Sequence, residues 1–363
     1  MSEAKPSRAL IAAVGLNPLR VVRAAMALGS THLVLLVTPS ASFAVEQIAQ
    51  ACRELELSVT QVLAVTVDEW VLSEVLTRVE QAANQIAELG VIGVPDVLVA
   101  GGTKPIVVTC ALIAEAWSDP DHTWTTNDST DIFANASGHE RRPPALASSL
   151  SLDTLASLHA GLWTDPSPGA HADLAWLRSR LHRPAPVGRT DRQRSDSGES
   201  GGLKFEAALE LLLRQLLPQE FHVHGAHSVV LRDPLDPQRA AFDPRAGSHG
   251  DLPVRRFEVD GVVICGARAW AIEAKFRNLK LRQAFTAYAE IDRRRRDLGG
   301  DTTRGILVFL SDETGDRLPE GPQPFAPAGV DVVTTRGLLQ ALDYVEGRDS
   351  TRPELLDLFT LMQ

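Results

Sequence analysis

The sequence has little cysteine and no long uninterrupted apolar stretch, and both absences narrow the class of protein. Its 363 residues include three cysteines, Cys52, Cys110 and Cys265. They are odd in number, far apart and set in apolar surroundings, so neither a disulfide framework nor a cysteine metal site is expected. Buried, reduced cysteines suit the cytoplasm. Because no apolar stretch could span a bilayer and the first residues lack the features of a secretion signal, we expect a cytoplasmic protein with no membrane partner.

Several common motifs of nucleotide chemistry are also missing. The sequence contains neither G-x-G-x-x-G nor the P-loop spacing, which disfavours a dinucleotide redox cofactor and ATP hydrolysis. A serine-hydrolase elbow is absent too. The length and the 44% apolar content allow two or three domains with sizeable cores. With a net charge of −10, the chain does not resemble a protein that coats nucleic acid non-specifically.

The first half alternates apolar strands with helices. This βαβα pattern predicts a Rossmann-like, doubly wound α/β domain over residues 1–150, with a small β-hairpin in 119–150 completing it. Strands are predicted at 8–14, 32–38, 59–66 and 96–100, and helices at 18–28, 43–55, 68–89 and 105–117.

The second half is predicted to be a separate α/β domain over residues 203–363. Residues 151–202 form a connector, with helices at 151–163 and 172–181 and a Pro-, Ser- and Gly-rich linker over 183–202. In the second domain, helices are predicted at 203–217 and 337–346, and a basic helix is predicted to follow the 257–276 segment and end at about residue 298. Strands are predicted at 221–231, 305–310 and 330–334.

Three loops of the first domain are candidates for ligand binding, because open α/β sheets bind ligands at the carboxyl ends of their strands. Paired glycines let a backbone approach a phosphate closely, and a helix N-terminus offers free N–H groups. Taken alone, the glycines could equally serve a tight structural turn. The candidate residues are Gly15, Asn17, Thr38, Gly101, Gly102, Thr103 and Lys104.

The most informative segment is a predicted β-hairpin over residues 257–276, with its turn at Gly266, Ala267 and Arg268. Charged residues rarely interrupt buried strands without a reason. Here Asp260 interrupts the first apolar arm and Glu273 and Lys275 interrupt the second.

Folding back at that turn brings Asp260 opposite Glu273 and Lys275, which share one face of their strand. Two carboxylates, with the backbone carbonyl of Ala274, make a hard-oxygen site suited to Mg²⁺ or Mn²⁺. Lys275 would act on the metal-bound water or on the phosphate. The pattern predicts a metal-dependent nuclease, and a surface Glu–Lys pair is the alternative.

Three further features bear on this site. Glu206, on the helix that opens the second domain, either reaches the metal or is an ordinary surface residue. The basic stretch 280–296 either lies along a polynucleotide backbone or is a solvated helix face. Finally, His222, His224 and His227 read as strand and turn residues, with metal binding as a minority alternative.

Together, the two halves carry a more specific resemblance. A Rossmann-like domain with Gly-Leu-Asn-Pro and Gly-Gly-Thr-Lys loops, followed by Asp260 and Glu273-Ala274-Lys275, resembles the CRISPR-associated CARF-domain nucleases over nearly the whole chain. The resemblance implies a CARF sensor joined to a restriction-endonuclease-like domain of the PD-(D/E)xK type. One departure is Val259, which stands where the family name has Pro.

The resemblance also implies partners and a mechanism. The sensor would bind a cyclic oligoadenylate, most often the tetra-adenylate, through the loop residues named above. Binding would activate cleavage of single-stranded DNA or RNA and nicking of supercoiled DNA in type III CRISPR antiviral defence. Asp260 and Glu273 would ligate the metal, Lys275 would assist the water, and Glu206 would be the acidic residue of the opening helix. A homodimer would match the symmetry of the cyclic ligand.

Two other interpretations remain open from the sequence. The first is a ligand-sensing regulator whose nuclease-like domain binds nucleic acid without cutting it. The second is an α/β enzyme that uses a phosphorylated small molecule at the Gly101–Lys104 loop, although this leaves the second domain unexplained.

Overall fold

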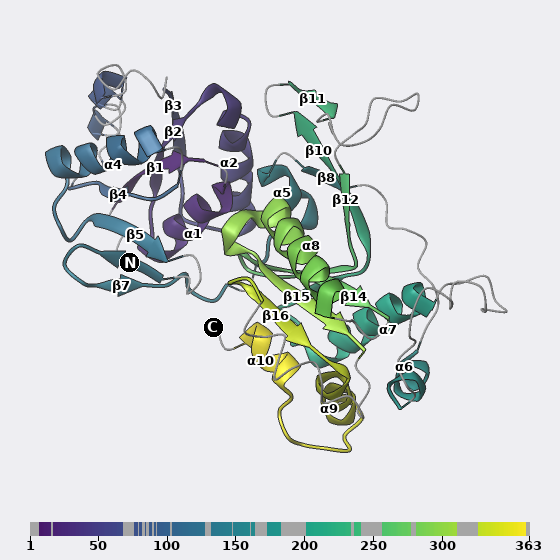
Figure 1. Cartoon of the computed structure of the whole chain (residues 1–363). Coiled ribbons are helices and arrows are strands. Elements are labelled where there is room, and N and C mark those ends of the chain that lie inside the picture. The colour runs from purple at the N-terminus through teal and green to yellow at the C-terminus, as the bar shows by residue number, and fades with distance from the viewer. Residues whose placement is uncertain are drawn as a thin grey trace. The chain divides into compact units, whose positions relative to one another are not determined.

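The protein consists of two compact α/β units (Figure 1). Met1–Leu162 and Leu231–Arg255 form the first unit, and Trp163–Val230 and Arg256–Gln363 the second. The computed structural model describes residues 7–15, 17–67, 91, 93–101, 104–127, 132–146, 148–159, 161–163, 173–182, 201–233, 236–240, 256–276, 281–310 and 326–360, with scattered positions between 76 and 88. Within these residues no helix combines the length and the apolar character that crossing a membrane requires.

The first unit is built on a seven-stranded sheet with the order β3-β2-β1-β4-β5-β6-β7. Strands β3, β2, β1, β4 and β5 run parallel, and β6 and β7 extend the sheet as antiparallel strands. The strands are β1 (Ala9–Val14), β2 (His32–Val37), β3 (Gln61–Thr66), β4 (Asp96–Leu98), β5 (Thr123–Asn127), β6 (Ile132–Asn135) and β7 (Glu140–Arg141).

Helices cover both faces of this sheet, as expected for a doubly wound domain (Figure 1). Every residue of β1 is buried. On one face, Ile11 packs in a cluster with Ile106 and Cys110 of α4, and α1 and α2 lie on the other. The helices are α1 (Pro18–Leu28), α2 (Ala44–Glu54), α4 (Lys104–Trp117) and α5 (Leu152–Leu158), with a 3₁₀ turn η1 (Pro39–Ala41).

The second unit contains a five-stranded sheet with the order β16-β15-β14-β13-β9. Strands β14, β15 and β16 are parallel, whereas β13 is antiparallel to both β14 and β9. The remaining strands lie outside this sheet, and β10 and β12 pair antiparallel. The strands after β7 are β8 (Gly161–Trp163), β9 (His222–His224), β10 (His227–Asp233), β11 (Asp236–Ala240), β12 (Arg256–Val259), β13 (Gly261–Cys265), β14 (Arg268–Lys275), β15 (Arg304–Phe309) and β16 (Val330–Val333).

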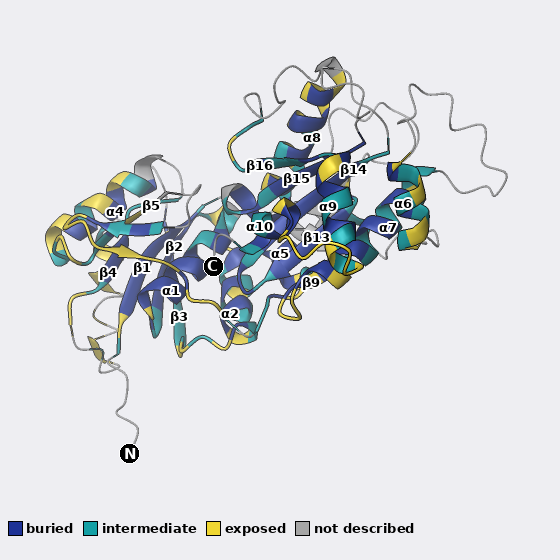
Figure 2. Ribbon diagram, turned by 90° about the horizontal axis from the view of Figure 1, so that it is seen from below, coloured by how far each residue is buried: buried dark blue, intermediate teal, exposed yellow. Residues whose placement is uncertain are grey.

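Two helical layers sandwich the second sheet. Trp270 and Ile272 of β14 point into one large core with Phe205 of α7 and Leu338 of α9. Because neighbouring side chains on a strand point to opposite faces, residues 271, 273 and 275 face the other side, which α8 covers. Figure 2 shows this buried interior. The helices are α6 (Leu174–Leu181), α7 (Gly201–Leu216), α8 (Leu281–Gly299), α9 (Thr335–Val345) and α10 (Glu354–Thr360), with a 3₁₀ turn η3 (Gly300–Thr302).

The predicted α/β fold class is confirmed, and several element predictions need correction. The first arm of the hairpin is two strands, β12 and β13, because the chain bends at Asp260. The predicted strand over 221–231 is also two strands, separated at residues 225–226, and the predicted helix over 151–163 ends at Leu158 before β8. The described positions of the predicted helix 68–89 are helical, but its first turns and residues 183–200 of the predicted linker lie outside the described residues.

Candidate functional site

The centre of the candidate site is Glu273 on β14, which is 0% exposed. A buried carboxylate requires compensating partners. Lys275, two residues along the same face of the strand, pairs with Oε1 of Glu273, and Arg294 of α8 pairs with Oε2. Glu290, one helical turn before Arg294, lies 3.8 Å from Nζ of Lys275. Glu273 and Lys275 are therefore held between their strand and α8.

Asp260 lies beside this strand, as the hairpin prediction requires. Its backbone N–H donates to the carbonyl of Ile272 at 3.1 Å, and its Oδ2 accepts a hydrogen bond from the N–H of Ala274 at 2.7 Å. Burial raises the pKa of Asp260 above its ordinary value, while the Ala274 N–H and the charges of Lys275 and Arg294 act in the opposite direction. The bend at this residue turns its carboxylate toward the end of β14.

The Ala274 carbonyl is directed to the same side as Asp260. In a β-strand the N–H and the C=O of one residue point to the same edge, and the Ala274 N–H binds Asp260. The carbonyl of Lys275 points to the opposite edge, where it accepts from the N–H of Leu310 at 3.3 Å. The backbone of Ala274 is thus oriented as a ligand to an ion beside Asp260 would need to be.

Glu206 of α7 belongs to the same group of charges. Burial and the negative charge of Asp260 raise its pKa from 4.5 to about 7, and Glu258 adds to this rise. Lys275 acts in the opposite direction. The structure therefore brings together Glu206, Asp260, Glu273 and Lys275, the four residues predicted as catalytic from the sequence.

Two residues of this group were missed by the sequence analysis. Glu258 lies two positions before Asp260, so a period-two reading of β12 could have placed the two acids on one side. Arg294 was seen only as a member of a basic run. Its pairing with Glu273 depends on how α8 packs on β14, for which the sequence gives no signal.

The donor set fits a hard divalent cation in chemistry. Asp260, Glu273 and the Ala274 carbonyl supply oxygen ligands of the kind that Mg²⁺ and Mn²⁺ prefer. Burial and, after it, repulsion by Asp260 raise the pKa of Glu206, and a bound cation would relieve the repulsion. Among the described residues, however, no three acidic, histidine or cysteine side chains converge on one point. The carboxylate of Glu273 is turned onto Lys275 and Arg294.

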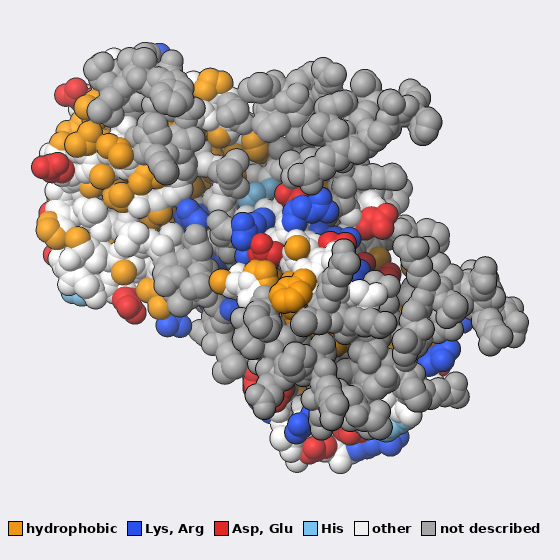
Figure 3. All heavy atoms as spheres, viewed as in Figure 1, with side chains coloured by type: hydrophobic (Ala, Val, Ile, Leu, Met, Phe, Trp, Pro, Cys, Tyr) orange, Lys and Arg blue, Asp and Glu red, His pale blue; other side chains and the backbone are white. Residues whose placement is uncertain are grey.

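The basic stretch of α8 is divided between the interior and the surface. Arg295 is 3% exposed and donates to Asp292, to the carbonyl of Thr303 and to the carbonyl of Ala328. With Arg294 also turned inward, Arg293 and Arg296 are the exposed members of the arginine run. Figure 3 shows Lys and Arg side chains beside Asp and Glu side chains over α8. The stretch is therefore less of a continuous basic face than the sequence indicated.

The candidate ligand loops of the first unit lie at the carboxyl ends of its parallel strands. Gly15 and Asn17 follow β1, Thr38 follows β2, and Gly101 lies between β4 and α4. Gly101 has φ +82°, a conformation suited to glycine, and a Cβ added there would lie 3.3 Å from the carbonyl oxygen of Ala13. Gly102 and Thr103 lie outside the described residues, as does the side chain of Lys104.

Asn17 is the most informative of these loop residues. Both polar atoms of its side-chain amide are buried, and neither has a hydrogen-bond partner within the described part of the chain. Such an amide is costly unless a ligand or water satisfies it. Arg20, one turn into α1, places Nη1 3.6 Å from the position of a Cβ on Gly101, so a cation missed by the sequence analysis borders the same end of the sheet.

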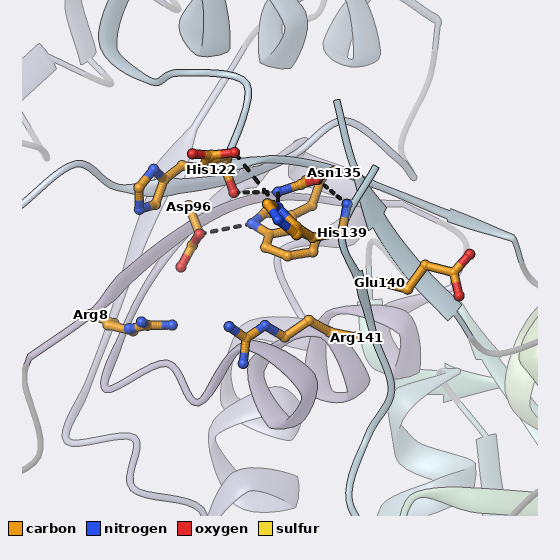
Figure 4. Close-up of a pocket in the computed structure, with 9 residues that line it drawn as sticks. Arg8, Asp96, His122, Asn135, His139, Glu140 and Arg141 are labelled. Atoms are coloured by element: carbon orange, nitrogen blue, oxygen red, sulfur yellow. Dashed lines mark hydrogen bonds and ion pairs between the residues drawn. The ribbon is translucent and has the colours of Figure 1, made fainter. Parts of the chain in front are cut away.

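A separate cavity of about 440 Å³ lies at the other end of this sheet, where β1 and β4 begin. Figure 4 shows Arg8, which precedes β1, and Asp96, which begins β4, on its walls together with Arg141. Trp124 Nε1 donates to Oδ1 of Asp96 at 2.8 Å, and burial raises the pKa of this carboxyl. The lining carries both signs of charge and comes from the ends of several strands, which explains why no sequence motif marked it.

The three histidines of the second unit behave as strand and turn residues. The rings of His224 and His227 meet edge to face at 6.3 Å. Burial, with the charges of His227, His222 and Arg214, lowers the pKa of His224 to about 4. The described residues around them supply no metal-binding group of three, so the minority alternative gains no support.

Comparisons with known proteins give matches in structure rather than in sequence. No protein-family model matches the chain, and no curated protein matches it. Protein VC1899 from Vibrio cholerae has a TM-score of 0.58 at 10% identity, with 94% of this chain and 97% of that chain covered.

Two further solved structures carry descriptions of function. Can2 from Sulfobacillus thermosulfidooxidans, in complex with cyclic tetra-adenylate, has a TM-score of 0.52 at 12% identity, covering 92% of this chain and 98% of that chain. A type III CRISPR defence DNA nuclease activated by cyclic oligoadenylate has a TM-score of 0.52 at 17% identity, covering 90% of this chain and 54% of that one. The fold of this chain is therefore the fold of these proteins, in agreement with the resemblance to CARF-domain nucleases that the sequence carries.

Proposed function

We propose that the protein is a metal-dependent nuclease activated by a cyclic oligoadenylate, the tetra-adenylate, in type III CRISPR antiviral defence. The observation that carries the proposal is the meeting of Asp260, Glu273 and Lys275 at the end of β14, with Glu206 beside them. The fold shared with a cyclic tetra-adenylate complex and with a cyclic-oligoadenylate-activated DNA nuclease supports it.

In the nuclease unit, Asp260, Glu273 and the Ala274 carbonyl would hold Mg²⁺ or Mn²⁺. When bound, such an ion supplies a Lewis acid and a water of lowered pKa. Lys275 presents its ammonium group on the same face as Glu273, where it can stabilise charge on the phosphate or orient the attacking water. Glu206, a carboxylate beside Asp260, would be placed to accept or return a proton at this site.

In the sensor unit, the loops after β1, β2 and β4 would hold the activator. The unpartnered amide of Asn17 offers donors and an acceptor to a base or a ribose. The positive φ of Gly101 lets its backbone approach a phosphate, and Arg20 adds a charge that suits one. Gly15 and Thr38 complete this end of the sheet.

A homodimer follows from the symmetry of the ligand. A ring of repeated adenylates matches a two-fold axis, with each subunit contributing the same loops. For the ligand to activate the nuclease, it must bind the active arrangement more tightly than the resting one. Single-stranded DNA, single-stranded RNA and supercoiled DNA are the proposed substrates.

One observation favours an alternative, a ligand-sensing regulator whose nuclease-like unit binds nucleic acid without cleaving it. Both oxygens of Glu273 are paired with cations of the protein itself, as they would be in a site that no longer takes a metal. A cleavage assay decides between the two. Metal-dependent cutting of any of the three substrates that requires the activator supports the nuclease. Binding of activator and nucleic acid without cutting supports the regulator.

A further inference from the structure

The buried carboxylate of Glu273 is already paired with cationic side chains of the protein itself. It is 0% exposed, and it lies between Lys275 and Arg294. Lys275 is two residues away on the same strand, so its pairing follows from strand geometry. Arg294 comes from another element, and its guanidinium takes the second oxygen.

Arg294 differs in its bonding from the adjacent Arg295. Arg295 is held by Asp292 and by two backbone carbonyls, those of Thr303 and Ala328, which is the pattern of a structural arginine. By contrast, Nε of Arg294 is buried and has no hydrogen-bond partner among the residues that the structure describes. Its guanidinium pairs with Glu273. Burial lowers the pKa of Arg294, and the charges of Asp260 and Glu258 act in the opposite direction.

A divalent ion bound by Asp260 and Glu273 needs a carboxylate oxygen of Glu273. Lys275 pairs with Oε1 and Arg294 with Oε2, so a divalent ion bound there would repel the cation that shares its oxygen. Lys275 is fixed close to Glu273 by its own strand, whereas Arg294 extends from α8 on a long side chain and, among the described residues, pairs directly with Glu273 while Asp260 and Glu258 act on it through charge. The ion and Arg294 therefore compete for the same oxygen.

We propose that Arg294 is an internal counter-cation of Glu273 that a divalent metal ion displaces when it binds. This inference rests on the proposed metal-dependent nuclease. It assigns Arg294 a positioning role, because in the metal-free protein the guanidinium neutralises a buried carboxylate and holds it in place. The metal affinity of the protein is consequently lower than its oxygen ligands alone would give.

Mn²⁺ binding, measured by the loss of the electron paramagnetic resonance signal of the free ion, tests this without any cleavage step. Full-length protein, free of nucleic acid, is titrated as wild type, Arg294→Ala, Arg294→Gln, Arg293→Ala and Glu273→Gln. Arg293 is the matched control, since it is exposed on the same helix and its loss removes the same charge without touching Glu273. Arg294→Gln keeps much of the side-chain volume in case the alanine variant fails to fold.

Both Arg294 variants should bind Mn²⁺ roughly tenfold more tightly than wild type, a change of about 1.4 kcal/mol. Arg293→Ala should stay within about twofold. Without metal, the Arg294 variants should melt at a lower temperature than wild type, and Mn²⁺ should raise their melting temperature by more.

The failure of this inference differs from the failure of the proposed function. Equal or weaker Mn²⁺ binding by both Arg294 variants, while wild-type binding is lost in Glu273→Gln, overturns the competition and leaves the metal site standing. If neither the wild type nor the two Arg294 variants show Mn²⁺ binding that depends on Glu273, both the competition and the proposed metal site are overturned. Binding that appears only in the Arg294 variants supports the competition in its strongest form.

Discussion

Replacing Glu206 by Gln should remove a pH dependence of stability from the metal-free protein. Burial and Asp260 raise the pKa of Glu206 from 4.5 to about 7 in the folded state. A group whose folded pKa is raised binds more protons in the native state than in the unfolded state. Its contribution to stability is therefore fully present below pH 4.5 and is lost as the pH rises to about 7.

The size of the effect follows from the shift. A rise from 4.5 to about 7 corresponds at most to about 3 kcal/mol, at about 1.4 kcal/mol for each pH unit. Glu206 is only partly buried, so solvent screening reduces this to about 1–2 kcal/mol. For a unit of this size the difference is roughly 3–6 °C in melting temperature.

Scanning calorimetry in the presence of a chelator is the assay. Wild type and Glu206→Gln should melt together near pH 4, and the variant should melt higher at pH 8. Glu210→Gln is the control, because Glu210 lies one turn further along α7 and pairs with Arg214 rather than with the acidic group. Equal melting temperatures at pH 8, or a wild type that melts higher there, would show that burial and Asp260 do not raise the pKa of Glu206.

Three further changes test separate parts of the account. Glu273→Gln should abolish metal-dependent cleavage, measured on plasmid. It should also destabilise the protein by about 3 kcal/mol in urea unfolding, because it leaves two partly buried cations without their anion. Asn17→Ala should weaken the binding of cyclic tetra-adenylate by roughly tenfold or more in calorimetric titration. The stability of the variant should be unchanged or slightly higher, because an amide without a described partner is removed. Equal affinity of variant and wild type would exclude Asn17 from the ligand site. Gly101→Ala should lower the free energy of unfolding by about 1–3 kcal/mol through backbone strain and should also weaken ligand binding. Gly29→Ala is the control, because Gly29 has φ +64° and a Cβ there would have no atom within 4 Å. It should lower the free energy of unfolding without changing ligand affinity.

Much of the first unit could be predicted because local signals agree with its fold. Helix α1 spans Pro18–Leu28 as predicted, since Pro18 suits the first turn and Gly29, at φ +64°, ends the helix in a left-handed conformation. The buried parallel strands read as continuous apolar runs. The order of the strands and the antiparallel extension by β6 depend on pairings between distant segments, which no local pattern fixes.

In the candidate site, too, some residues are revealed by local sequence signals and others depend on tertiary packing. Glu273 and Lys275 could be found because charges within an apolar strand are conspicuous, and Asp260 because the two-residue turn at Gly266 and Ala267 sets the register of β13 on β14. The break at Asp260 was missed, although the dipeptide Asp260-Gly261 is of a kind that marks turns. The turn of Arg294 toward Glu273 depends on the rotation of α8 against the sheet, which is a property of tertiary packing.

The central claim is that metal-dependent cutting by this protein is switched on by a cyclic oligoadenylate. The most direct test incubates purified protein and Mn²⁺ with single-stranded DNA, single-stranded RNA or supercoiled plasmid, with and without cyclic tetra-adenylate, and includes Lys275→Ala. The account predicts cutting by the wild type only when the activator is present, and none by Lys275→Ala. Cutting that ignores the activator, or that survives in Lys275→Ala, would contradict it.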